Sequence, residues 1–127
     1  MKFTSNRTVD DLMGDYFDTL QQCGKNLLNM SDEEIGYRIF EEFDGGAISF
    51  LHENTLSELR KANLITETIS QKSAKLRGKF MALESTDLWN VGSVKCTKEW
   101  REVLELSDEI KSLLNLQVRL NVQPGKP

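Results

Sequence analysis

Histidine and cysteine are scarce in this chain of 127 residues, which limits the metal sites, disulfides and nucleophilic sites that it can form. His52 is the only histidine, and zinc sites need three or four ligands, so we expect no metal site. Cys23 and Cys96 lie far apart and form no Cys-X-X-Cys motif, so we expect free thiols, with Cys23 buried. The sequence alone does not exclude a nucleophilic pair formed by His52 and one of the two thiols.

Long apolar runs are also missing. No segment approaches the roughly 20 apolar residues that a membrane-spanning helix needs. The N-terminus, MKFTSNRTVDDL, lacks the apolar stretch of a secretory signal. We therefore expect a cytoplasmic protein that does not associate with membranes. Gly45-Gly46 is not followed by Lys and Ser or Thr, so it is not a phosphate-binding loop.

The net charge of −4 is unevenly distributed. Residues 8–44 contain ten acidic and two basic residues, giving −8, and the remainder contains ten acidic and fourteen basic residues, giving +4. The acidic region would repel phosphates, so we expect no direct nucleic-acid partner. It suits a basic protein partner instead. The basic residues between Lys72 and Lys79 could form internal ion pairs with the acidic helices.

Apolar residues recur at helical spacing along most of the chain. This pattern predicts an all-α, single-domain bundle of about five to seven helices over residues 1–127. Capping residues mark several helix starts: Thr8, Ser31, Thr66 and Thr97. A further helix begins near Asn54 or Thr55 and ends near Asn63. Residues 85–96 give no clear pattern, and residues 1–7 and 117–127 are expected to be flexible or irregular.

The segment from Ile35 to Leu64 is expected to organise the core. Its first helix should end near Phe43, and Gly45-Gly46 should form a sharp turn. The apolar residues AISFL that follow predict a short, central, buried helix. The expected core takes residues from the apolar side of each helical pattern: Phe17, Ile39, Phe43, Phe50, Leu76, Phe80, Trp100 and Leu104.

Acidic residues are expected on the outer faces of the first two long helices. Those of the first helix lie opposite its apolar stripe, and those of the second crowd its C-terminal end, where negative charge opposes the helix dipole. Adjacent carboxylates on a helix surface usually face water, so we expect no catalytic site and no cofactor. We predict a partner-binding surface of six acids: Asp11, Asp15, Asp18, Glu41, Glu42 and Asp44.

Two segments, EEFDGGAISFLHENTLSELRKANLI and LWNVGSVKCTKEWREVLELSDEI, together resemble small helical immunity proteins of bacterial toxin–immunity systems of the contact-dependent growth inhibition type. The most distinctive motifs in these segments are Phe50-Leu51-His52-Glu53 and Val94 followed by Glu99-Trp100. The resemblance implies a cytoplasmic non-enzyme that binds and blocks a cognate toxin domain. Such toxins are often nucleases. We expect the protein to be a monomer.

Two other functions fit the same residues. An acidic helical adaptor or regulatory protein, of phage or bacterial origin, would bind a different protein partner. An enzyme would assemble its site from scattered carboxylates, and its structure would show a deep pocket with convergent acids. An immunity gene would lie directly downstream of a toxin-domain reading frame, which distinguishes it from an adaptor gene.

Overall fold

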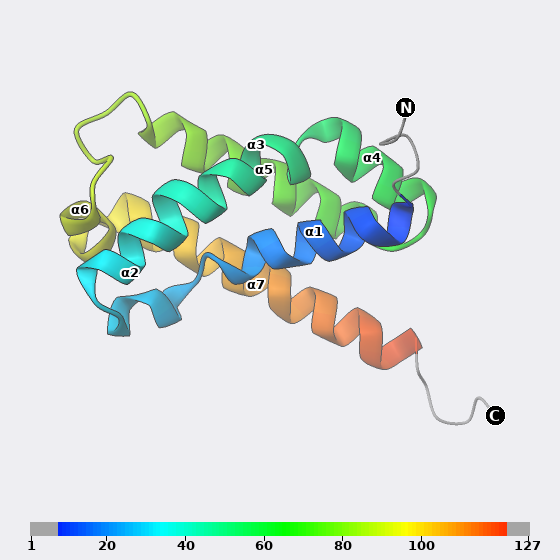
Figure 1. Cartoon of the computed structure of the whole chain (residues 1–127). Coiled ribbons are helices and arrows are strands. Elements are labelled where there is room, and N and C mark those ends of the chain that lie inside the picture. Colours follow the sequence, from blue (N-terminus) through cyan, green and yellow to red (C-terminus); the bar gives the residue numbers. More distant parts are fainter. Residues whose placement is uncertain (1–7, 122–127) are drawn as a thin grey trace.

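The computed structural model describes residues 8–121, with side chains to residue 117. These residues form helices and no strands (Figure 1), which confirms the all-α prediction. In chain order they are α1 (Val9–Gln21), the 3-10 segment η2 (Lys25–Asn29), α2 (Asp32–Tyr37), the π-helical segment η3 (Arg38–Phe43), α3 (Asp44–Phe50), α4 (Glu53–Lys61), α5 (Glu67–Leu83), α6 (Val91–Cys96) and α7 (Lys98–Asn121). Since α2, η3 and α3 are continuous, the described residues contain six helices besides η2.

The helices form one compact domain with two layers. In one layer α1 runs beside the continuous α2–η3–α3 helix, and in the other α5 packs along α7 (Figure 1). At one end of the domain α4 contacts both α1 and α5, and at the other end α6 contacts α2 and α7. The last turns of α7 extend past α1 in Figure 1.

Side-chain caps begin four helices at the predicted residues. The Thr8 hydroxyl accepts a hydrogen bond from the Asp11 amide at 3.0 Å, and the Asp11 carboxylate accepts one from the Thr8 amide. Ser31, Thr66 and Thr97 likewise accept bonds from amides three residues further on, at 3.1–3.3 Å. These caps satisfy amides that have no partner inside their own helix.

Helix α4 begins at Glu53, slightly before the predicted start. Its cap is His52, whose Nδ1 accepts a hydrogen bond from the Asn54 amide at 3.1 Å. The half-buried His52 therefore orients the turn into this helix. Just beyond the end of α4, Asn63 has a φ of 62°, a left-handed angle that asparagine tolerates.

Most of the predicted core is confirmed. Six of its residues are 0% exposed: Ile39, Phe43, Leu76, Phe80, Trp100 and Leu104. Phe80 lies at the centre of an aromatic cluster, with ring centroids 4.7 Å from Phe43 and 5.8 Å from Trp100. The prediction for Phe17 is wrong, because its side chain is 39% exposed. Phe50 is only partly buried against the core and is not a central plug.

The predicted turn at Gly45-Gly46 is wrong, because both glycines lie inside the continuous helix. Five apolar residues spaced four apart form one buried stripe along it: Ile35, Ile39, Phe43, Ala47 and Leu51. In a regular α-helix each four-residue step rotates by about 40°, so this stripe would drift by about 160°. The hydrogen bonds of η3 span one residue more, which offsets much of this drift. The segment AISFL is thus no separate buried helix, and Ile48 is 48% exposed.

Two segments for which the sequence predicted no regular structure are helical. Residues 91–96, within the segment of unclear pattern, form α6. Residues 117–121, expected to be irregular, belong to α7. Residues 1–7 and 122–127, also expected to be irregular, lie outside the described residues.

Candidate partner-binding groove

A groove of about 350 Å³ lies between α1 and the continuous α2–η3–α3 helix. Four of the six acids predicted for partner binding line it. Asp15 and Asp18 come from α1, and Glu41 and Glu42 come from η3. The structure therefore brings together acids that are more than 20 residues apart in the sequence, and we call this feature the acidic groove.

Helical spacing places the α1 acids on the groove side. Asp15, Asp18 and Gln22 are three and four residues apart, so they share one side of the helix. Tyr16 and Leu20 lie on the adjacent side and are 0% exposed, which fixes the rotation of α1 against the core. The acids must consequently face outward, along the border between α1 and its neighbour.

The floor of the acidic groove is a close contact between α1 and α3. Gly46 is buried, and a Cβ added there would lie 2.9 Å from the Thr19 Cβ, closer than real Cβ atoms come. The Thr19 hydroxyl donates a hydrogen bond to the Asp15 carbonyl oxygen at 2.8 Å. Gly45 is exposed, and no atom lies within 4 Å of the position that its Cβ would take. Gly46 thus allows the two helices to pack closely, whereas Gly45 lies beside open space.

One carboxylate of the acidic groove, that of Glu42, is held by a neighbouring side chain. It accepts a hydrogen bond from the Tyr37 hydroxyl at 2.7 Å. This hydrogen bond and the nearby charge of Glu42 raise the pKa of Tyr37. The two basic residues of the acidic region form ion pairs outside the groove, Arg38 with Glu34 at 2.7 Å and Lys25 with Glu105 at 3.8 Å.

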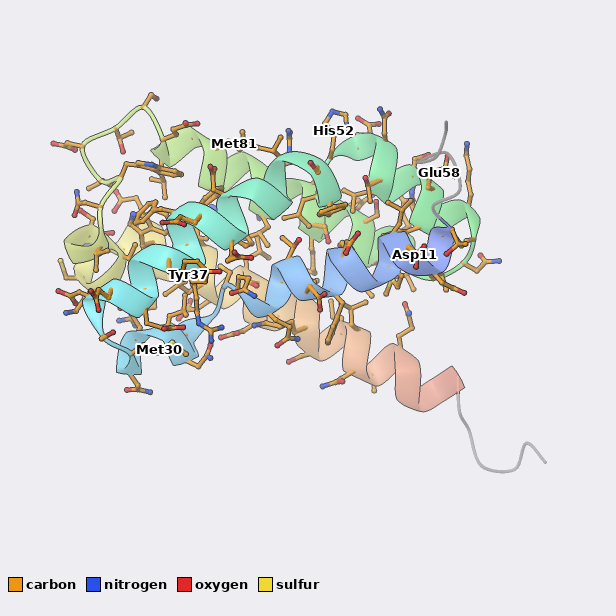
Figure 2. All side chains as sticks on the ribbon, viewed as in Figure 1. Asp11, Met30, Tyr37, His52, Glu58 and Met81 are labelled. Carbon is orange, nitrogen blue, oxygen red and sulfur yellow. The ribbon has the colours of Figure 1, made fainter. Side chains whose placement is uncertain are left out.

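The other two predicted acids do not line the acidic groove. Asp11 belongs to the cap of α1, and Asp44 is half-buried in the first turn of α3. Figure 2 shows Asp11 near the N-terminal end of α1, and Tyr37 at the opposite end of this face. Sequence reasoning also missed Gln22 and Phe50 as groove-lining residues, since their position depends on how the helices pack.

Three of the four basic residues of α5 contact other parts of the domain. Lys72 lies 2.8 Å from Glu109, and Lys79 lies 3.3 Å from Glu102. The Arg77 Nε donates a hydrogen bond to the Ala47 carbonyl oxygen at 2.9 Å. The expected internal pairs therefore form, but the acids come from α7 and not from the acidic N-terminal helices.

The two thiols differ in burial and both are free. Cys23 is 0% exposed, and burial raises the pKa of its thiol to about 12, with a hydrogen bond to Ser107 and the charge of Lys111 acting in the opposite direction. A thiol protonated at neutral pH is a poor nucleophile. Cys96 is exposed, and its Sγ donates to the Gly92 carbonyl oxygen at 3.1 Å. Within residues 8–121, no three His, Cys, Asp or Glu side chains are grouped to hold a metal ion.

Comparison of the chain with models of known protein families, with curated proteins and with solved structures gives no match. None of the helices in the described part of the chain is both long and apolar enough to cross a membrane.

Proposed function

We propose that this protein is an immunity protein that binds a cognate bacterial toxin domain with nuclease activity through the acidic groove and neutralises it. The observation that carries the proposal is the convergence of carboxylates from α1 and η3 on one surface groove, where Asp18, Glu41 and Glu42 are exposed and do not lie in the deep pocket expected of an enzyme. The resemblance of two segments to helical immunity proteins of the contact-dependent growth inhibition type supports it. The chain would act as a cytoplasmic monomer without a cofactor.

Charge complementarity supplies the proposed mechanism. A nuclease binds the phosphates of its substrate with basic residues. An acidic surface attracts such a site from a distance, which raises the association rate, and disfavours partners of like charge. Once bound, the protein would occupy the phosphate-binding surface and exclude the nucleic acid. Inhibition of this kind needs no chemical step on the inhibitor.

Preorganisation of the acidic groove supports tight binding. The close contact of Gly46 with Thr19 fixes the distance between the two helices that carry the carboxylates. The hydrogen bond from Tyr37 holds Glu42 in position. A surface that is already ordered loses less conformational entropy on binding, so more of the interaction energy contributes to affinity.

The proposal is tested with the toxin domain that the reading frame directly upstream is expected to encode. Asp15, Asp18, Glu41 and Glu42 are changed together to Lys, and association with the toxin is followed by stopped flow at low and high salt. We expect association to slow by about 10- to 100-fold at low salt and to lose most of its salt dependence. Protection of cells against the toxin should fall in parallel.

A matched control carries the same change in net charge elsewhere. Four exposed acids outside the acidic groove are changed to Lys: Glu58, Glu84, Asp87 and Glu99. Equal slowing in both variants would contradict the proposal, because net charge and not the groove would then govern association. Binding that leaves the toxin active would instead favour the adaptor function.

A further inference from the structure

The corner between α3 and α4 consists of only two residues. Helix α3 ends at Phe50 and α4 begins at Glu53, so Leu51 and His52 alone connect them. Leu51 is 1% exposed and anchors the corner in the core. His52, labelled in Figure 2, is half-buried and is the only histidine of the chain. The bonding of His52 therefore bears directly on how the chain turns from one helix into the next.

Two side chains form hydrogen bonds that hold this corner. The Asn54 amide donates to the His52 Nδ1 at 3.1 Å. The Thr55 hydroxyl donates to the Ser49 carbonyl oxygen at 2.8 Å, from the first turn of α4 back to α3. A hydroxyl does not titrate near neutral pH, whereas an imidazole does. Only the bond to His52 can therefore respond to mild acid.

The bond to His52 requires one protonation state of the imidazole. A backbone amide can only donate, so the Nδ1 that faces it must carry a free lone pair. The neutral imidazole with its proton on Nε2 meets this requirement, whereas the imidazolium ion carries a proton on both nitrogens and cannot accept. The charge of the imidazolium would also oppose the dipole of α4 at its N-terminal end. Protonation therefore removes the cap and replaces it with a repulsive contact.

No direct ion pair offsets this penalty. Three elements pack against α4, namely α1, α3 and α5. Arg77 of α5 donates to the Ala47 carbonyl oxygen at 2.9 Å, so a cation already lies beside α3. In the part of the chain that the structure describes, His52 forms no ion pair with any carboxylate. The charged residues on the surrounding turns of these elements and of α4 are Asp11, Asp15, Asp44, Glu53, Lys75 and Arg77.

We propose that the α3–α4 corner is a pH-sensitive latch, closed by the neutral His52 side chain and opened when its imidazole is protonated. An unperturbed imidazole takes up its second proton near pH 6.5. Because the unfolded chain accepts this proton without losing a cap, the free energy of unfolding should fall as the pH falls through this range. Phe50 lines the acidic groove and directly precedes the corner, so the latch connects pH to one wall of the groove.

Amide hydrogen exchange of the ¹⁵N-labelled full chain tests the latch at single residues. The protection factor of the Asn54 amide should fall by about fivefold between pH 7.5 and pH 5.5, the loss expected for a helix cap of typical strength. The Ile69 amide is the matched control, because it donates at 3.1 Å to the Thr66 hydroxyl at the start of α5, a cap that does not titrate. Its protection factor should stay the same.

A conservative variant separates the cap from its titration. His52→Asn keeps a side-chain acceptor that caps helices well but has no titrating group. Its Asn54 protection factor should be equal at the two pH values. The urea midpoint of the natural chain should fall by roughly 0.5 M more than that of His52→Asn over the same range. His52→Ala lacks the acceptor, so its Asn54 amide should be poorly protected at both pH values.

Three results would overturn the latch. The first is an Asn54 protection factor that does not change with pH in the natural chain. The second is an equal loss at Asn54 and Ile69, which would indicate a general effect of acid on the domain. The third is an equal loss at Asn54 in the natural chain and in His52→Asn. None of these measurements uses the toxin, so each outcome is independent of the proposed function.

Discussion

The adjacent residues Gly45 and Gly46 allow a sharp test of how α1 packs on α3. Both lie in the same helical turn, so replacing either with alanine brings a similar gain of up to about 1 kcal/mol in helix propensity. Gly45→Ala places its methyl group in open space and should stabilise the protein. Gly46→Ala places its methyl group 2.7 Å from the Thr19 Cγ2 and 2.9 Å from the Thr19 Cβ.

The second substitution forces the two helices apart or rotates Thr19. Overpacking of this kind costs about 1–3 kcal/mol. Because helix propensity contributes to both variants alike, the difference between their free energies of unfolding should equal this cost. We expect Gly46→Ala to be less stable than Gly45→Ala by about 1–3 kcal/mol. Urea unfolding followed by circular dichroism at 222 nm measures both values.

A double variant connects the loss to the proposed contact. Thr19→Ala removes the Cγ2 and Oγ1 atoms that lie near the new methyl group. Combining it with Gly46→Ala should therefore recover part of the stability, as a coupling of at least about 0.5 kcal/mol. Equal stability of the two single alanine variants, or strict additivity in the double variant, would refute close packing at this point.

Three further predictions concern stability. Phe43→Ala should cost about 3–5 kcal/mol in urea unfolding, because Phe43 is fully buried against Phe80, and a loss below about 1 kcal/mol would contradict the core assignment. Lys111→Met should lower the free energy of unfolding by about 1–2 kcal/mol, because the Lys111 Nζ donates to the Cys23 carbonyl oxygen at 2.7 Å, near the C-terminal end of α1. Unchanged stability would contradict this role. The pKa of Tyr16 is raised to about 12, so the folded state holds this proton more tightly than the unfolded state, and the free energy of unfolding should fall as the pH rises from about 10 to 12. Urea unfolding across that range should show a shallower fall for Tyr16→Phe, and an unchanged slope would contradict the assignment.

The features that sequence predicted best are those set by local interactions. Thr8 and Ser31 cap helices because each hydroxyl needs only an amide three residues away. The burial of Leu76 and Phe80 follows from apolar spacing within a single helix. Such features depend little on which other helix packs nearby, and a sequence pattern therefore contains most of the information.

The features that sequence missed depend on packing between helices. Phe17 lies next to the apolar stripe of α1, but it is left 39% exposed. Gly46 looked like a helix breaker because glycine is poor in helices, yet the approach of Thr19 requires a residue without a Cβ. Ser107 and Lys111 bind the Cys23 carbonyl oxygen from more than 80 residues away. No local pattern indicates contacts at that separation.

The candidate site was predictable in part for the same reason. Periodicity indicated that Asp15 and Asp18 face outward, because helical spacing fixes their direction relative to the buried stripe. It could not indicate that Glu41 and Glu42 lie across a groove from them, nor that Asp11 and Asp44 lie outside it. Those positions depend on how α1 packs against its neighbouring helix.

The π-helical segment η3 links the core to the acidic groove. Tyr37 and Glu42 are five residues apart, and in a regular α-helix they would point about 140° away from each other. The longer hydrogen-bond repeat of η3 brings residues five apart closer in direction, and Tyr37 donates to Glu42 at 2.7 Å. The same segment keeps the four-residue apolar stripe facing the core. The directions of the groove carboxylates on this wall are therefore set by the packing of apolar residues on the opposite side of the helix.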